Sequence, residues 1–192
     1  MFVIGLTGGI ATGKSTVAHF FAYHGIPIIN SDETAHHLLT QPLVIEHISK
    51  FAPKAIENNV INRTKLGEIV FTNDEKLNRL ENLLHPLIQQ SEQEIIHSMQ
   101  CLGKNIILLD IPLLFETRDT VEFDMTITTS CPERVQISRA MARNGMTKTK
   151  LEAIMARQIA TIDKEAMADA TLSTGLNKAH TMRQVKQLLS EI

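Results

Sequence analysis

Gly8-Gly9-Ile10-Ala11-Thr12-Gly13-Lys14-Ser15 has the spacing G-x-x-x-x-G-K-[ST] of a phosphate-binding loop. The apolar run of residues 2–6 precedes it and predicts a strand, and residues 15–21 follow with apolar residues at helical spacing. Strand, glycine-rich turn and helix, in this order, form the context that the pattern requires. A tight glycine turn without a ligand is the alternative, and the agreement of pattern and flanks disfavours it.

The residue types in this stretch suit a nucleoside triphosphate. Glycines let the backbone curl so that successive N–H groups point at phosphate oxygens, and the following helix adds the positive end of its dipole. Lys14 is placed to reach the β- and γ-phosphates, and the Ser15 hydroxyl to hold Mg²⁺. We therefore expect these residues to bind the nucleotide: Gly8, Gly9, Ile10, Ala11, Thr12, Gly13, Lys14, Ser15 and Thr16.

The composition is that of an ordinary globular protein. The chain has 192 residues, which suits one domain, and 43% of them are hydrophobic. A net charge of −2 offers no broad basic surface, so we expect no nucleic-acid partner. The N-terminus lacks a signal-peptide pattern, and no run approaches the roughly 20 apolar residues of a membrane helix. Cys101 and Cys131 lack the spacing of a zinc or redox pair. From the absence of these targeting patterns, the sequence predicts a cytoplasmic protein without a membrane partner.

Apolar runs alternate with helical patterns along the chain. Besides the strand before the loop, short strands are expected at residues 26–29, 106–109, 125–128 and 170–173. Residues 43–100 have a helical pattern throughout, with helix starts expected at Thr64, Asn73 and Pro86. Interleaved strands and helices indicate an α/β fold with a parallel sheet, whose ligand lies at the carboxyl ends of the strands.

The chain has no clear guanine-reading sequence. GTPases usually carry Asn-Lys-x-Asp, whereas here Asn177-Lys178 is followed by Ala179 and then His180, which stands in the place of the aspartate. The sequence therefore disfavours a GTPase.

Asp32 directly follows the second expected strand. It should therefore face the same crevice as the phosphate loop. A carboxylate there can accept the proton of an attacking hydroxyl or bind the metal. A helix cap formed by Ser31 or Asp32 explains the residue equally well.

Arg139 and Arg143 are four residues apart in a helix expected to run to about Asn144. Arginines on one helix face can neutralise the charge that develops on a transferring phosphoryl group. A solvated helix face with weak surface ion pairs is the alternative, and without further context it is favoured.

A set of distinctive segments is spread over nearly the whole chain: Leu6–Ile10, Gly13–Thr16, Asp32, Asn62–Leu66, Leu84-His85-Pro86, Ile111–Glu116, Gln136 with Arg139 and Arg143, and Ala168-Asp169. Together, and in this order, these segments resemble the dephospho-CoA kinase family. The Leu-His-Pro and Pro-Leu-Leu-Phe-Glu segments are more specific than the loop, because other nucleotide kinases lack them.

The resemblance implies ATP-dependent phosphorylation of the ribose 3′-hydroxyl of dephospho-coenzyme A, the last step of coenzyme A biosynthesis, with Mg²⁺ as cofactor. It implies a three-layer α/β/α P-loop kinase fold with a five-stranded parallel sheet, as one domain over residues 1–192. A helical substrate-binding insertion is expected at about 33–100, and a small lid at about 139–160. ATP and dephospho-CoA are then the partners of a monomer or small homo-oligomer.

Roles follow from the resemblance residue by residue. Asp32, Lys14 and Arg139 are expected to be catalytic, Asp32 also as a possible metal ligand, and Arg143 to close over ATP with the lid. The substrate side is expected to comprise Arg63, His85, Pro112, Leu113 and Leu114. For His85 a structural cap before Pro86 is an equal alternative. For Asp110, at the end of a buried strand, a structural hydrogen bond is favoured over contact with the metal.

Three departures from the family pattern stand out. Asn30 replaces the first acid of the usual Asp-Ala-Asp, and Ala11-Thr12 replaces the usual Gly-Ser. The alanine is tolerable at negative φ or with mild strain. Residues 168–175 depart from the usual Asp-Asn pair, so adenine contacts there are in doubt. A kinase for another nucleotide or nucleoside, and a nucleotide-dependent switch, remain as alternatives.

Overall fold

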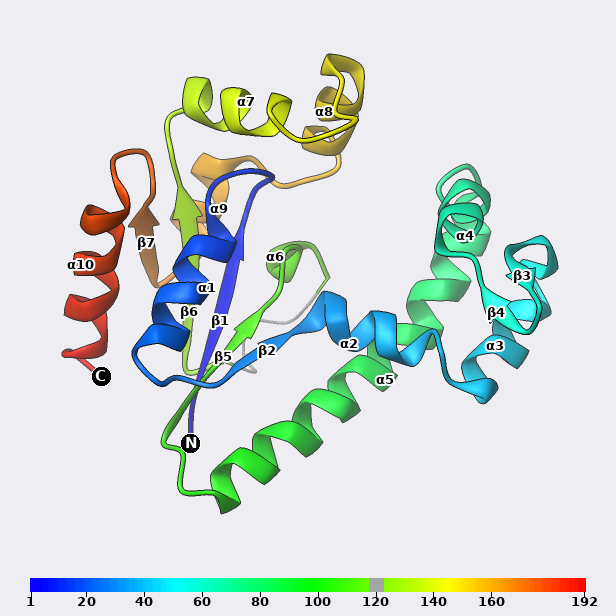
Figure 1. Cartoon of the computed structure of the whole chain (residues 1–192), viewed down its shortest axis with the longest axis horizontal. Helices are drawn as coiled ribbons and strands as arrows, with labels where there is room; N and C mark the ends of the chain where they lie inside the picture. The colour runs from blue at the N-terminus through cyan, green and yellow to red at the C-terminus, as the bar shows by residue number, and fades with distance from the viewer. Residues whose placement is uncertain (118–122) are drawn as a thin grey trace. The chain divides into compact units, whose positions relative to one another are not determined.

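The computed structural model describes residues 1–117 and 123–192, and Figure 1 shows the course of the chain. The chain divides into two compact units, one of residues 1–29 with 99–192 and the other of residues 30–98. The second unit covers nearly the residues expected as an insertion. Its role in binding substrate stays a prediction.

A five-stranded parallel sheet forms the centre of the first unit (Figure 1). Its strands are β1 (Phe2–Gly8), β2 (Ile28–Asn30), β5 (Ile106–Asp110), β6 (Met125–Ser130) and β7 (Ala170–Ser173), in the order β2-β5-β1-β6-β7. Ile4 of β1 lies between Leu108 and Met125 of the neighbouring strands. The expected parallel sheet is confirmed, with the phosphate loop leaving the carboxyl end of the central strand.

Helices cover both faces of this sheet, because side chains alternate along each strand. On one face Ile4, Leu6 and Leu108 pack against α1 (Lys14–Tyr23) and α10 (Lys178–Leu189) in one buried cluster. Gly5 points to the other face, where a Cβ would lie 3.2 Å from Leu114 of α6 (Leu114–Thr117). There α9 (Thr161–Met167) also contacts β6. The expected α/β/α layering is confirmed, and α7 (Glu133–Met141) and α8 (Lys148–Met155) follow β6.

The second unit contains helices and a small hairpin. Its elements are α2 (Ser31–Leu38), α3 (Pro42–Ser49), the 3₁₀ turn η1 (Pro53–Ala55), β3 (Ile56–Glu57), β4 (Val60–Ile61), α4 (Arg63–Val70) and α5 (Asp74–Cys101), whose last residues belong to the first unit. Although α5 has 28 residues, no helix in the described ranges is long and apolar enough to cross a membrane.

Two expectations for this region are wrong. The helical pattern is interrupted by the hairpin, whose turn residues Asn58 and Asn59 have φ of 50° and 61°. Asparagine tolerates this conformation, as hairpin turns with two positive φ values require. Pro86 does not start a helix but lies inside α5, because Leu84 and Ile88 on either side are buried in the apolar core of the unit. Packing of this kind outweighs the hydrogen bond that a proline removes.

Asp169 ties the start of β7 to β6. Its carboxylate accepts hydrogen bonds from the backbone N–H and the Oγ1 of Thr126, both at 2.7 Å. The Thr126 hydroxyl, and after it the backbone donor, lowers the pKa of Asp169 from its ordinary value of 3.8. A carboxyl group whose pKa is lower in the folded state than in the unfolded state stabilises the fold at pH values above its unfolded-state pKa. This stabilisation is lost as the pH falls through the folded-state pKa.

We expect Asp169→Asn to lower the free energy of unfolding at pH 7 by about 1 kcal/mol, the value of a partly exposed hydrogen-bonded charge. Between pH 5 and pH 3 the unsubstituted chain should lose more stability than the variant, because only its residue 169 becomes protonated. Urea unfolding at pH 7, 5 and 3 measures both effects, with Asp163→Asn on the surface of α9 as control. Parallel pH profiles for the two chains would contradict the assignment.

Candidate active site

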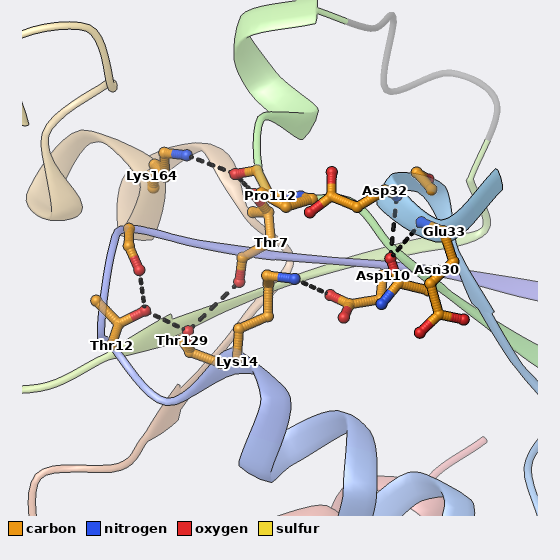
Figure 2. A network of polar contacts seen from close by, with 12 residues as sticks. Thr7, Thr12, Lys14, Asn30, Asp32, Glu33, Asp110, Pro112, Thr129 and Lys164 are labelled. Carbon is orange, nitrogen blue, oxygen red and sulfur yellow. Dashed lines mark hydrogen bonds and ion pairs between the residues drawn. The ribbon is translucent and has the colours of Figure 1, made fainter. Parts of the chain in front are cut away.

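The phosphate loop is held by hydroxyl groups from the ends of neighbouring strands. Thr12 Oγ1 donates to the Gly9 carbonyl at 2.8 Å and lies 2.7 Å from Thr129 Oγ1 at the end of β6 (Figure 2). Thr174, directly after β7, donates through its hydroxyl to the Thr12 carbonyl. Thr12, Thr129 and Thr174 are all buried. The Thr12 side chain therefore stabilises the loop itself, and contact of Thr12 with the nucleotide stays a prediction.

Close approach of these threonines explains two of the glycines. A Cβ at Gly8 would lie 2.1 Å from Thr129 Oγ1. Gly13 has φ of 97°, and a Cβ there would lie 2.8 to 3.0 Å from three side-chain atoms of Thr174. Both positions exclude a side chain, so the glycines serve the packing of the loop as well as its curvature.

Ala11 has a left-handed backbone conformation, with φ of 60°. For an alanine this costs about 1–2 kcal/mol relative to the right-handed region. Its methyl group is buried with Ala140 and Leu151 of α7 and α8. The sequence left open whether Ala11, which replaces the usual glycine, has negative φ or mild strain, and the structure shows the strained conformation.

Lys14 forms an ion pair with Asp110 at the end of β5 (Figure 2). The two side chains are 16% and 6% exposed, so the pair is largely shielded from water. Asp110 thereby holds the ammonium group of Lys14 beside the loop. The structural interaction favoured for Asp110 is present, as an ion pair with the lysine of the loop.

The loop offers a positive helix end and oxygen ligands. Ser15 is exposed in the first turn of α1, where N–H groups have no partner within the helix. Within residues 1–117 and 123–192 no three or more His, Cys, Asp or Glu side chains gather as a metal cluster. Mg²⁺ commonly takes one or two protein oxygens and completes its shell with substrate phosphates and water. The Ser15 hydroxyl fits that requirement, and Asp110, which is paired with Lys14, is a second candidate oxygen ligand.

Arg139 does not stand free on its helix. Its Nη1 donates to Thr174 Oγ1 at 3.0 Å, and its Nη2 to the Thr174 carbonyl at 2.7 Å. Arg143 is exposed and lies beyond α7, which ends at Met141 and not near Asn144. The two arginines therefore do not share one helix face as expected, because the chain turns after Met141.

The segment after β5 is anchored through the Pro112 carbonyl, which accepts hydrogen bonds from Thr7 Oγ1 at 3.0 Å and Lys164 Nζ at 3.3 Å (Figure 2). Leu113 is 37% exposed, whereas the Leu114 side chain is completely buried. Of the residues expected on the substrate side here, Pro112 and Leu113 are accessible to a ligand and Leu114 belongs to the core.

In the second unit, Asn30 is the cap of α2. Its side-chain oxygen accepts from the N–H groups of Asp32 at 3.0 Å and Glu33 at 3.2 Å (Figure 2). The exposed carboxylate of Asp32 is therefore not used as a cap, and neither is Ser31, whose hydroxyl donates to the buried Glu92 at 2.6 Å. The departure from the family at residue 30 supplies a capping oxygen.

Arg63 and His85 also lie in the second unit. Arg63 is exposed in the first turn of α4, and His85 is half-buried within α5. Because Pro86 continues the helix, His85 is not a cap before a helix start.

The sequence analysis missed Thr129 and Thr174, the residues that hold the phosphate loop. They belong to no sequence motif, and their place at strand ends is the signal that could have found them.

Comparison with known proteins agrees with this arrangement. The family model described as dephospho-CoA kinase matches residues 2–179. The dephospho-CoA kinase of Bartonella quintana is 39% identical over 192 residues, which cover 100% of this chain and 98% of the relative. A crystal structure from Thermus thermophilus is similar with a TM-score of 0.86, 27% identity, and 100% and 97% coverage. The dephospho-CoA kinase of Campylobacter jejuni gives a TM-score of 0.74, 27% identity, and 98% and 96% coverage.

We expect Gly13→Ala to destabilise the chain and weaken ATP binding at least tenfold. The strain of positive φ costs about 1–2 kcal/mol, and the overlap with Thr174 adds about 1–3 kcal/mol. Gly25→Ala is the matched control, because φ there is 80° and no described atom lies within 4 Å of its Cβ. Urea unfolding and calorimetric titration with ATP measure the two effects. Equal losses in both variants would contradict a specific contact with Thr174.

Proposed function

The chain belongs to the dephospho-CoA kinase family, and we propose that it transfers the γ-phosphoryl group of ATP to the ribose 3′-hydroxyl of dephospho-coenzyme A, which gives coenzyme A. The observation that carries this proposal is the family match over residues 2–179, within which the loop 8–16 follows the central strand of the sheet. A monomer or small homo-oligomer and a cytoplasmic place remain predictions from the sequence.

Residues Gly8 to Thr16 are proposed to bind the phosphates of ATP. The loop leads into the N-terminus of α1, which begins at Lys14, and the dipole of the helix favours an anion placed there. Lys14 exchanges its partner Asp110 for the β- and γ-phosphates, which keep the ammonium group neutralised. The ion pair thus keeps Lys14 in place before ATP arrives.

Mg²⁺ is the proposed cofactor, with Ser15 as its protein ligand and Asp110 and Asp32 as further candidates. When bound, it would neutralise charge on the phosphates. Asp110 is paired with Lys14 in the structure. When Lys14 binds the phosphates instead, the Asp110 carboxylate would become available as a ligand of Mg²⁺.

Asp32 is proposed to orient the acceptor hydroxyl and to take its proton late in the transfer. Its carboxylate is exposed and is not used by the cap of α2, which Asn30 provides. Phosphoryl transfer depends mainly on positioning and charge stabilisation, so a carboxylate that aligns the hydroxyl has a large effect on turnover. We assign Arg63, His85, Pro112 and Leu113 to the substrate side.

Arg139 and Arg143 are proposed to stabilise the charge that develops on the transferred group, from a lid of about 139–160. For Arg139 this requires that its two hydrogen bonds to Thr174 break. Closure of such a segment also excludes water that would otherwise hydrolyse ATP.

A screen of acceptors tests the proposed reaction. We expect ADP formation from ATP with dephospho-coenzyme A, and none above background with AMP, CMP, shikimate or pantothenate. Coupled measurement of ADP, with mass spectrometry of the product, identifies the phosphorylated position. Turnover with another acceptor would indicate a different kinase, and slow hydrolysis that no acceptor changes would indicate a nucleotide-dependent switch.

We expect Asp32→Asn to lower kcat roughly 100-fold or more, in the range of general-base catalysis, with little change in ATP affinity. The matched control is Glu33→Gln, because Glu33 is also exposed and its N–H also bonds to Asn30. Steady-state kinetics with both substrates and an ATP titration separate the two quantities. Near-normal turnover in the Asp32 variant would refute the assigned role.

A further inference from the structure

Two glutamine side chains hold the backbone of Ile10 in the phosphate loop. Gln158 Oε1 accepts the Ile10 N–H at 2.9 Å, and Gln136 Nε2 donates to the Ile10 carbonyl at 2.9 Å. Gln136 is 5% exposed and Gln158 is half-buried. Because both polar groups of one residue are engaged, the two amides fix the orientation of its backbone.

The residue that follows is Ala11, with φ of 60°. A strained backbone persists where its surroundings over-determine the conformation. Here the constraints are the two amides on Ile10 and the apolar cluster in which Ala11 packs against Ala140 and Leu151. All of them come from α7, α8 and the segment after α8.

Gln158 is itself positioned by its neighbour. The N–H of Ile159 donates to Glu116 Oε1 at 2.9 Å. Lys164 Nζ lies 2.8 Å from Glu116 Oε1 and 3.1 Å from Oε2, and its side chain is completely buried. The same ammonium group bonds to the Pro112 carbonyl (Figure 2). An ion pair within the core therefore holds the backbone from which the Gln158 amide reaches the loop.

We propose that Gln158, together with Gln136, is a positioning residue that holds the backbone of Ile10 and thereby keeps Ala11 in the left-handed conformation of the loop that binds the triphosphate. The Lys164–Glu116 pair positions Gln158 through Ile159. The inference rests on the proposed function only in that the loop binds ATP, and the acceptor has no part in it.

The amide is the side chain that suits this position. It accepts the N–H of Ile10 as a carboxylate would, but it carries no charge. A negative charge beside a loop that binds a triphosphate would repel the ligand. An apolar side chain of the same length would leave the N–H of Ile10 without this acceptor, and the loop could relax to a conformation without strain at Ala11.

Gln158→Met in the full-length chain tests this role, since methionine keeps the length of the side chain and removes the acceptor. We expect the dissociation constant of ATP, measured by calorimetry, to rise roughly tenfold, which corresponds to the strain of one left-handed alanine. Adding Ala11→Gly should restore the constant to within about twofold, because glycine adopts this conformation without strain. An unchanged constant in Gln158→Met, or no restoration in the double variant, would overturn the proposal.

Gln184→Met is the matched control. Gln184 Oε1 accepts the Ser173 N–H at 3.0 Å and its Nε2 donates to the Ser173 carbonyl at 2.8 Å, so it holds a backbone residue in the same way outside the loop. Any effect of this variant should not be corrected by Ala11→Gly. Equal correction of both variants would mean that glycine stabilises the loop in general, and the proposal would fail.

Hydrogen exchange in the chain without nucleotide provides a measurement that does not depend on the reaction. The Ile10 amide should exchange faster in Gln158→Met than in the unsubstituted chain or in Gln184→Met. Exchange that is equal in all three would overturn the inference. If the exchange and ATP results hold while dephospho-coenzyme A is not phosphorylated, the proposed function fails and the positioning role of Gln158 stands.

Discussion

The phosphate loop depends on a set of hydrogen bonds between its own backbone and hydroxyl groups at the ends of β6 and β7. Thr129 bonds to Thr12, and Thr174 bonds to the Thr12 carbonyl, all in buried positions. These contacts are possible because parallel strands end at one edge of the sheet, so that residues 117 and 162 positions apart in sequence meet there. The glycines at 8 and 13 are required by the same contacts, since side chains would collide with Thr129 and Thr174. The conformation of the loop therefore depends on neighbouring strands of the sheet as well as on its own eight residues.

Two ion pairs of low exposure organise the surroundings of the loop. Lys14 is paired with Asp110, and Lys164 with Glu116. Removal of one partner of a buried pair typically costs about 3–5 kcal/mol, because the other charge is left without compensation. The Lys14 pair is one that a bound phosphate can replace, which suits the catalytic role proposed for Lys14. The Lys164 pair, with Lys164 completely buried, also bonds to the Pro112 carbonyl and to the N–H of Ile159, and so joins two segments at the end of the sheet.

Much of the fold follows from sequence patterns, and the exceptions have identifiable causes. The strands β1, β2 and β5 were predictable because buried parallel strands are short, mostly apolar runs between helices. The strands β6 and β7 gave a weaker signal, since threonine and serine stand among their apolar residues. The hairpin at residues 56–61 was missed because its strands have two residues each, too few for an alternating pattern. Pro86 was misjudged as a helix start because local preference was weighed without the packing of Leu84 and Ile88. For Asp32, the sequence could not separate a helix cap from a carboxylate that acts on the acceptor hydroxyl. Asn30, Ser31 and Asp32 are all residue types that can cap a helix, and only the hydrogen bonds to Asn30 show which residue does so.

The sequence by itself determined the nature of the nucleotide loop, the parallel sheet and the family, because these depend on residue types at fixed spacing along the chain. The tertiary structure alone decided which residues hold that loop. Ala11 has a left-handed conformation, and Gln136 and Gln158 bond to Ile10 from 126 and 148 residues away. No local pattern predicts a side-chain contact over such separations, because it arises from the packing of α7 and α8 against the end of the sheet. The chemistry of the loop thus depends on eight consecutive residues. Its geometry depends on distant residues that come close to the loop only when the chain folds.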